Sequence, residues 1–159
     1  MEINDLWISN DQDLWKSYLD KYWRQVPRKN INLEKELDIL NQKVKRHEDI
    51  KDWYTFLFDK YFPWKYTAAN RLATARGAFE REYANDKEKL NNKIASLFKA
   101  VFENPDDIEN CLKKVTGAND GIKGLGVAGG SGLLAILFPN YFATVDQFVA
   151  ENIIRIDEF

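Results

Sequence analysis

Three residues of this chain have types and positions that suggest a chemical role. They are two glycines separated by one residue and a single carboxylate that follows them. The segment Lys123-Gly124-Leu125-Gly126-Val127 lies between two stretches with helical periodicity, a pattern typical of a helix-hairpin-helix turn. Such a turn presents backbone N–H groups at the start of a helix, where a phosphate can bind. Asp146 follows twenty residues after Gly126, at the end of Phe142-Ala143-Thr144-Val145-Asp146. A phosphate-binding turn paired with an acid indicates chemistry on DNA.

The elements that must position these residues are helices. Apolar residues recur at helical spacing along almost the whole chain, and no segment alternates with a period of two. We predict an all-α, compact multi-helix protein with one domain over 1–159. Within it, 1–48 could form a separate N-terminal subdomain, and 105–149 holds the hairpin and the Asp-containing loop. The expected helices cover 11–24, 33–44, 49–62, 67–83, 86–102, 105–116, 127–138 and 145–154.

Three residues are expected to mark helix ends. Pro63 should stop the helix that begins near residue 49, because proline lacks an N–H group. Asn32 and Asn104 should cap the helices that follow them. The narrow apolar stripe over 33–44 is shorter than two heptads, so we expect it to dock onto the domain rather than form a coiled coil.

Length and composition indicate one domain with a sizeable hydrophobic core. The 159 residues are 45% hydrophobic and 14% aromatic. Windows of about 18 apolar residues are absent, so we expect no membrane span. The start, Met1-Glu2-Ile3-Asn4-Asp5, is acidic, so we do not expect it to act as a signal peptide. A single cysteine fits a reducing compartment, and together these features predict a cytoplasmic protein.

Residues that bind metals or attack substrates covalently are scarce. Cys111 is the one cysteine and His47 the one histidine, and His47 stands in a charged run where we expect it to face solvent. One Cys and one His are too few for a zinc cluster, and we expect no Cys–His nucleophile because His47 should face solvent. We therefore expect no metal and no cofactor.

Charge is distributed unevenly, although the formal net charge is only −2. Residues 101–159 contain four basic and nine acidic side chains, a net charge of −5, so residues 1–100 carry +3. Non-specific affinity for DNA comes mainly from neutralising phosphates. Any basic face must therefore come from the N-terminal helices.

Three other groups of residues are interpreted structurally. A spacing of five residues spreads three arginines around a helix as a solvated surface: Arg71, Arg76 and Arg81. Four tryptophans are assigned to the core or an interface rather than to base stacking: Trp7, Trp15, Trp23 and Trp53. Three glycines within one helix indicate close approach, which we assign to a neighbouring helix rather than to DNA: Gly129, Gly130 and Gly132.

From Ile122 to Asp146 the chain resembles the helix-hairpin-helix DNA glycosylases, a base-excision superfamily named for its hairpin and a Gly/Pro-rich loop ending in Asp. The stretch Ile122-Lys123-Gly124-Leu125-Gly126-Val127-Ala128-Gly129-Gly130 falls without a gap on the family pattern L-P-G-V-G-x-K-T-A, and Val145-Asp146-Gln147-Phe148-Val149 falls on V-D-x-x-V. The segment 137–142 is similar to the turn that precedes the Asp in small members of this superfamily. The pair Trp64-Lys65 is similar to an upstream W-K pair. The resemblance is limited to residues 105–149.

The resemblance implies roles for these residues. The hairpin segment 123–127 would hold a DNA phosphate, and Asp146 would stabilise an oxocarbenium-like sugar or activate a water. Aromatic side chains would hold a base flipped out of the stack, and the candidates are Trp64, Tyr66 and Tyr141. Ala128 stands where the family's Schiff-base lysine lies when present, so we expect no strand-cleaving lyase activity. The four cluster-binding cysteines of one branch are absent.

The leading hypothesis is therefore a DNA-binding protein that acts as a monofunctional DNA N-glycosylase in base-excision repair. Two alternatives fit the same residues: a non-catalytic hairpin module that binds DNA, and a helical interaction protein with a degenerate glycosylase-like fold. The hairpin glycines can be an ordinary turn, and Asp146 stands where an acid caps the last helix. DNA is the expected partner, a protein partner or a homo-oligomer is compatible with the sequence, and a membrane is not expected.

Overall fold

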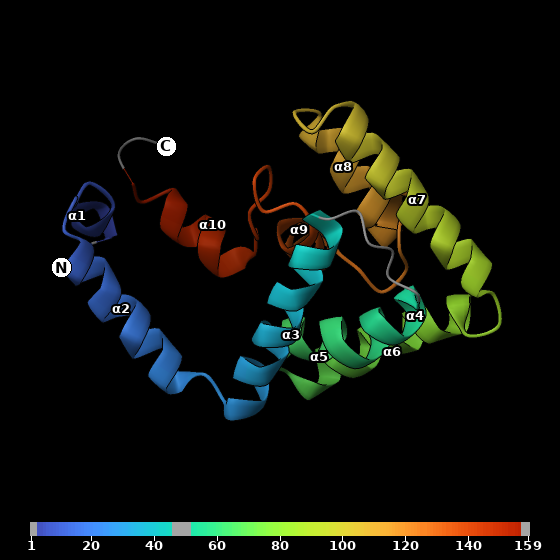
Figure 1. Cartoon of the computed structure of the whole chain (residues 1–159), viewed down its shortest axis with the longest axis horizontal. Helices are drawn as coiled ribbons and strands as arrows, with labels where there is room; N and C mark the ends of the chain where they lie inside the picture. Colours follow the sequence, from blue (N-terminus) through green and yellow to red (C-terminus); the bar gives the residue numbers. More distant parts are fainter. Residues whose placement is uncertain (1–2, 46–51, 157–159) are drawn as a thin grey trace.

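The computed structural model describes residues 3–45 and 52–156, so His47 lies outside the described residues. Within these ranges the chain is all-α, as predicted, and strand-like pairing is limited to a single bridge between Thr116 and Ile122. None of the described helices is long and apolar enough to cross a membrane. Figure 1 shows α1 and α2 at one side of the molecule, with α3 leading from them into the body.

The N-terminal part consists of α1 (Ile3–Trp7), α2 (Gln12–Gln25) and α3 (Arg28–Lys45). The Asp11 carboxylate caps α2 by accepting from the backbone of Asp13 and Leu14. The carbonyl of Pro27 accepts from Asn30 N–H at 2.8 Å, so α3 begins directly after this proline. The expectation that Asn32 caps this helix is therefore wrong, because Asn32 lies inside α3.

Helix α3 docks onto the body, as the short apolar stripe predicted. Leu33 and Leu37 are 7% and 3% exposed. Only the first part of the stripe is tested, since the side chains of residues 39–51 are outside the described set. Helix α2, in contrast, has no buried side chain.

The middle of the chain is one continuous helical stretch whose winding changes twice. The α-turn α4 (Trp53–Thr55) passes into the π-helix η1 (Phe56–Tyr61), and this into α5 (Phe62–Lys65). Pro63 does not stop the helix as expected. It lies in the first turn of α5, where it has no N–H group to donate, and the Phe58 carbonyl five residues earlier accepts from the Arg76 guanidinium. The wider π-turn leaves Tyr61 and Phe62 fully buried.

Three longer helices follow: α6 (Ala69–Tyr83), α7 (Lys87–Glu103) and α8 (Ile108–Val115). Aspartates cap the last two, because Asp86 accepts from Lys89 N–H at 2.9 Å and Asp107 accepts from Asn110 N–H at 3.1 Å. The expected cap at Asn104 is therefore wrong, and Asn104 instead ends α7. After the short 3-10 turn η2 (Gly117–Asn119) come α9 (Val127–Leu137) and α10 (Gln147–Ile153).

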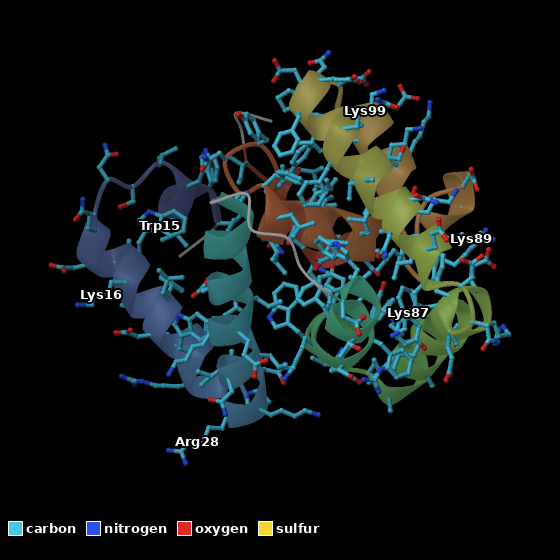
Figure 2. The ribbon with its side chains drawn as sticks, turned by 45° about the vertical axis from the view of Figure 1, so that its right-hand side comes forward. Trp15, Lys16, Arg28, Lys87, Lys89 and Lys99 are labelled. Carbon is cyan, nitrogen blue, oxygen red and sulfur yellow. The ribbon has the colours of Figure 1, made fainter. Side chains whose placement is uncertain are left out.

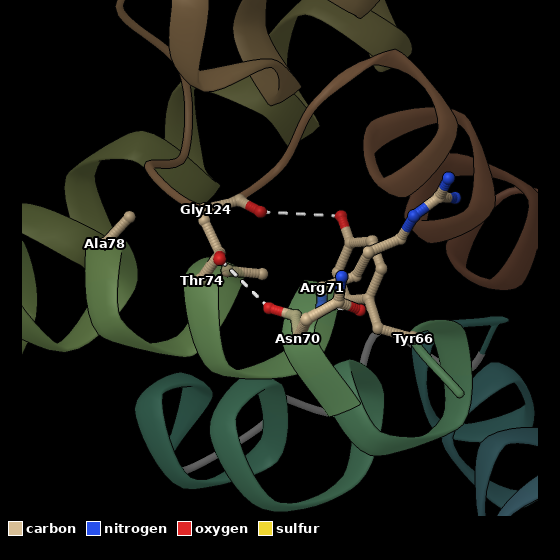
Figure 3. A pocket seen from close by; sticks show the side chains of 7 residues that line it. Tyr66, Asn70, Arg71, Thr74, Ala78 and Gly124 are labelled. Atoms are coloured by element: carbon tan, nitrogen blue, oxygen red, sulfur yellow. Dashed lines mark hydrogen bonds between the residues drawn. The ribbon is translucent and has the colours of Figure 1, made fainter. Parts of the chain in front are cut away.

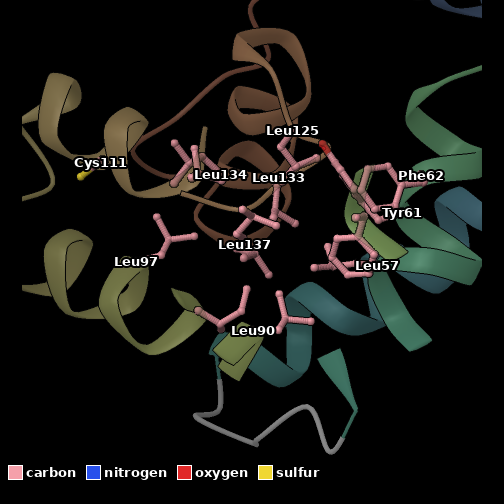
Figure 4. Packing of buried hydrophobic residues seen from close by; sticks show 14 of the residues in the cluster. Leu57, Tyr61, Phe62, Leu90, Leu97, Cys111, Leu125, Leu133, Leu134 and Leu137 are labelled. Carbon is pink, nitrogen blue, oxygen red and sulfur yellow. The ribbon is translucent and has the colours of Figure 1, made fainter. Parts of the chain in front are cut away.

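Helix α9 lies at the centre of the core. Its leucines at 133, 134 and 137 are at most 1% exposed. Figure 4 shows them surrounded by side chains of η1, α5, α7 and the turn before α9, including Leu57, Tyr61, Leu90, Leu97 and Leu125. A helix enclosed in this way must be apolar on most of its faces, and the sequence of α9 carries no charge.

Candidate functional site

The turn between α8 and α9 is closed by backbone hydrogen bonds and anchored in the core. Gly117 N–H donates to the Leu125 carbonyl at 2.8 Å, and Ile122 N–H donates to the Val115 carbonyl at 3.2 Å. The side chains of Ile122 and Leu125 are 0% and 2% exposed, so both anchor the turn in the core. The start of α9 is therefore held rigidly against the body of the protein.

The two glycines of the turn have different surroundings. Gly124 has a φ of +89°, and a Cβ placed there would lie 2.5 Å from the Ala75 carbonyl oxygen of α6. Gly126 has a φ of −84°, and a Cβ there would meet nothing within 4 Å. Close packing inside the protein explains Gly124. Only Gly126 leaves its side of the turn open to a ligand.

Lys123 is tied to the turn itself. Its ammonium donates to the Gly117 carbonyl at 3.0 Å, and its backbone N–H donates to the Tyr83 hydroxyl at 3.1 Å. The residue is nevertheless exposed. Its charge therefore lies at the surface of the turn, while its hydrogen bonds stabilise the local fold.

Helix α9 begins without a side-chain cap. Gly126 stands at the N-cap position, Val127 after it is 60% exposed, and the first bond within the helix runs from Gly130 N–H to the Gly126 carbonyl at 2.7 Å. In the described part of the chain, no acceptor is found for the N–H groups of Val127 and Ala128. Unpaired N–H groups at a helix start attract anions.

The glycines of α9 let side chains of neighbouring elements approach the helix closely. A Cβ at Gly129 would clash with the Tyr66 hydroxyl, and one at Gly132 would lie 2.8 Å from the Tyr61 hydroxyl. A Cβ at Gly130 would lie 2.8 Å from a methyl group of Val115 in α8. The groups that come close to these glycines therefore belong to the protein. They are tyrosine hydroxyls at Gly129 and Gly132 and a valine methyl group at Gly130, rather than backbone atoms.

Tyr61 is the most buried of these tyrosines, and its hydroxyl donates to the carbonyl of Gly129. Burial raises the pKa of this phenol well above its usual value near 10. The unfolded chain releases the proton near pH 10 and the folded chain keeps it. Stability therefore falls as the pH rises above 10, by up to about 1.4 kcal/mol per pH unit for this group.

We expect Tyr61→Phe to lower the free energy of unfolding by about 1–2 kcal/mol at neutral pH, because it removes a buried hydrogen bond to the Gly129 carbonyl. The variant should also lose less stability than the wild type between pH 10 and 11, since one phenol with a raised pKa has been removed. Urea unfolding at a series of pH values measures both effects. Equal pH slopes for the two proteins would contradict the second.

An open pocket of about 340 Å³ adjoins the hairpin turn. Figure 3 shows it between Gly124 and the first turns of α6, with the Tyr66 hydroxyl directed at the Gly124 carbonyl, to which it donates at 3.4 Å. Burial raises the pKa of Tyr66, and a hydrogen bond from the Gly126 backbone opposes this. The lining residues are Tyr66, Asn70, Arg71, Thr74, Ala75, Ala78 and Gly124.

Arg71 gives this pocket a positive charge. Among the described residues, no acid forms an ion pair with its guanidinium. Arg76, on the same helix, donates twice to the Phe58 carbonyl, at 2.9 and 2.6 Å, and lies over the Phe58 ring. The interpretation of these arginines as one solvated surface is therefore incomplete, because Arg71 lines a pocket and Arg76 binds the Phe58 carbonyl.

Asp146 caps α10 and also faces a lysine. Its Oδ1 accepts from Val149 N–H at 3.0 Å, and its Oδ2 lies 3.9 Å from the ammonium of Lys65. The Lys65 side chain is 11% exposed and that of Asp146 is 32% exposed. Burial lowers the pKa of Lys65, and the charge of Asp146 opposes this shift. Part of the carboxylate therefore remains open to solvent beside a nearly buried cation.

The Trp64–Tyr66 segment connects these features along α9. The Tyr66 hydroxyl reaches the helix at Gly129, and the Lys65 chain passes Gly132, three residues further along. Three residues of an α-helix span about 4.5 Å. The start of α9, the pocket and the Lys65–Asp146 pair therefore lie along one side of the same helix.

The three aromatic candidates are not brought together. Tyr66 lines the pocket, whereas the Trp64 indole donates to a carboxylate oxygen of Glu34 in α3. Tyr141 is 59% exposed and makes its ring contact with Phe142. Only Tyr66 adjoins the hairpin.

Lys65 and Arg71 are the residues that sequence reasoning missed. Lys65 carried a weak signal, since it belongs to the Trp64-Lys65 pair. Arg71 carried none, because its place at the pocket depends on the packing of α6 against the turn. No group of three or more His, Cys, Asp and Glu side chains in the described ranges could hold a metal ion.

Comparison with protein-family models, curated proteins and solved structures finds no match for this chain. The proposal about its function therefore depends on the geometry of the turn, the pocket and Asp146, together with the resemblance in the hairpin segment.

Proposed function

We propose that this chain is a divergent helix-hairpin-helix DNA glycosylase that binds the DNA backbone at the start of α9 and removes a base with the help of Asp146. The observation that supports DNA binding most strongly is the pocket beside Gly124. Arg71, which has no ion-pair partner among the described residues, lines this pocket together with Gly124, two residues before the N-cap of a helix that has no side-chain cap.

A phosphate has favourable partners at this position. The N–H groups at the start of α9 carry the positive end of the helix dipole. The Arg71 guanidinium can donate two parallel hydrogen bonds to phosphate oxygens. Gly126 leaves the approach open. The positive charge comes from α6, which lies in residues 1–100, the part of the chain with a net charge of +3.

Base removal is the second step of the proposal. The Asp146 Oδ1 is occupied by the cap of α10, whereas Oδ2 faces Lys65 and solvent. A carboxylate in this position can stabilise positive charge on a sugar as the glycosidic bond breaks, or take a proton from a water. Ala128 leaves the first turn of α9 without a nucleophilic amine, so the proposed enzyme is monofunctional.

The binding step is tested with Arg71→Gln. We expect this change to weaken binding to duplex DNA about 5- to 10-fold at low salt and to reduce the salt dependence by about one counterion, because one phosphate contact is lost. The measurement is fluorescence anisotropy over a salt series. Arg81→Gln is the matched control, since it removes the same charge from the same helix outside the pocket. Equal losses in the two variants would contradict a phosphate site at the pocket.

A second candidate is a hairpin module that binds DNA without catalysis. It is favoured by the two structural contacts of Asp146, which caps α10 and pairs with Lys65. In that case Arg71→Gln would still weaken binding, and no damaged duplex would lose a base.

A further inference from the structure

The segment that carries Asp146 is not fixed in place by the hydrophobic core. Phe142 packs against the core and Ile156 is buried, but none of the side chains at 143–155 is buried. Helix α10 lies within this segment, and in Figure 1 it lies on the opposite side of α9 from α7. Polar contacts must therefore decide where the Asp146 carboxylate is held.

The hydroxyl of Ser131 binds the backbone immediately before Asp146. Its Oγ accepts from Val145 N–H at 3.0 Å and donates to the Val145 carbonyl at 3.0 Å, with the Ala128 carbonyl at 3.3 Å as a second acceptor. The Val145 carbonyl belongs to the peptide group that leads into Asp146, and this group is planar, so its orientation is passed on to the next residue. Ser131 is 3% exposed and stands in α9. Its hydroxyl therefore fixes the backbone at Asp146 to the central helix of the core.

Lys65 faces the carboxylate oxygen that the cap of α10 leaves open. Its ammonium lies 3.9 Å from Asp146 Oδ2, and its side chain is 11% exposed. The ion-paired lysines of α7 that Figure 2 labels are several times more exposed: Lys87, Lys89 and Lys99. A Cβ at Gly132 would lie 3.3 Å from both Cδ and Cε of Lys65, so the missing side chain leaves room for the lysine to pass α9. The lysine therefore reaches Asp146 along a path that the packing of α9 defines.

We propose that Ser131 and Lys65 are positioning residues for Asp146, with Ser131 fixing its backbone on α9 and Lys65 fixing Oδ2. This inference rests on the proposed glycosylase activity, in which the carboxylate must meet the sugar in one orientation. A displacement of about 1 Å from the reacting atoms can cost about 100-fold in rate. The phosphate is assigned to Arg71 and to the N–H groups at the start of α9. Ser131 and Lys65 therefore act on the chemical step and not on the binding of DNA.

Ser131→Ala tests the contact to the backbone, because alanine removes both hydrogen bonds to Val145 and is well tolerated inside a helix. On the damaged duplex that the wild type processes fastest, we expect the single-turnover rate to fall about 30- to 100-fold and the Kd for the duplex to change less than about 2-fold. Ser96→Ala is the matched control, since it makes the same change within α7, which contributes no residue to the proposed site. Hydrogen exchange adds a measurement that needs no activity: relative to the amides of α7, those of α10 should exchange about 10-fold faster in Ser131→Ala than in the wild type.

Lys65→Met tests the contact to the carboxylate, because methionine keeps most of the length of the side chain and removes its charge. We expect the single-turnover rate to fall about 10-fold, since Oδ2 is then free to turn away from the sugar. Lys60→Met is the matched control. It removes the same charge from the helical turn before α5, where the exposed Lys60 pairs with Glu36 at 2.7 Å.

The possible failures of these experiments differ from one another. A wild type that removes no base from any duplex overturns the proposed function, and the positioning roles with it. If the wild type is active and Ser131→Ala and Lys65→Met lose no more rate than their controls, the positioning roles alone are overturned. They are also overturned if the losses appear in the Kd for the duplex and not in the single-turnover rate, because the two residues would then support binding.

Discussion

Gly124→Ala is expected to lower the free energy of unfolding by about 3 kcal/mol, because it combines a strained backbone conformation with overpacking. The residue has a φ of +89°, a region that alanine rarely adopts. Its new Cβ would lie 2.5 Å from the Ala75 carbonyl oxygen and 3.2 Å from Phe79 Cβ. Since α6 cannot move away without disturbing the core, the turn must shift instead.

Gly126→Ala is the matched control for this prediction. It adds the same methyl group two residues away, where φ is −84° and nothing lies within 4 Å. We expect the free energy of unfolding to fall by less than about 1 kcal/mol, because alanine is a poorer N-cap than glycine but meets no clash here. Urea unfolding of both variants measures the difference. Equal losses would contradict the distinction between a packed Gly124 and an open Gly126.

Asp146→Asn is expected to reduce base removal about 1000-fold if the proposed glycosylase activity is correct, because the amide carries no charge to stabilise the sugar cation and is a poor base. Asparagine caps helices about as well as aspartate, so the fold of α10 should be kept. The measurement is the formation of abasic sites on a panel of damaged duplexes, detected by strand cleavage in alkali.

Glu151→Gln provides the control for the charge removed from α10. Its carboxylate is exposed and accepts from the Gln147 side chain at 2.7 Å. We expect this variant to keep full activity. Equal activity of Asp146→Asn and the wild type would remove Asp146 from the mechanism. If no duplex loses a base and none is bound at low salt, the interaction-protein hypothesis is favoured.

Local interactions explain which helix ends were correctly predicted from the sequence. The interior periodicity identified the long helices, and the acids at 11, 86 and 146 stand at N-caps, where the side chain needs only its own backbone. The failures at Asn32 and Asn104 have one cause, because a residue nearby, Pro27 or Asp107, begins the helix instead. Pro63 fails for a different reason, since the helix continues through it.

The same difference between local and long-range interactions applies to the candidate site. The glycine pair and the carboxylate could be found from spacing alone. Their environments could not, because Gly124 packs on Ala75 and Asp146 faces Lys65 through contacts between residues far apart in the chain. The place of Arg71 at the pocket depends equally on how α6 lies against the turn.

The sequence by itself therefore determined the all-α class, the turn between α8 and α9 and the acid that begins α10, because helical periodicity, glycine conformation and capping act over a few residues. Only the tertiary structure decided which glycine is open, which arginine lines a pocket and which side chains hold Asp146 against α9. These depend on how the helices pack against one another, and no short-range pattern encodes that packing.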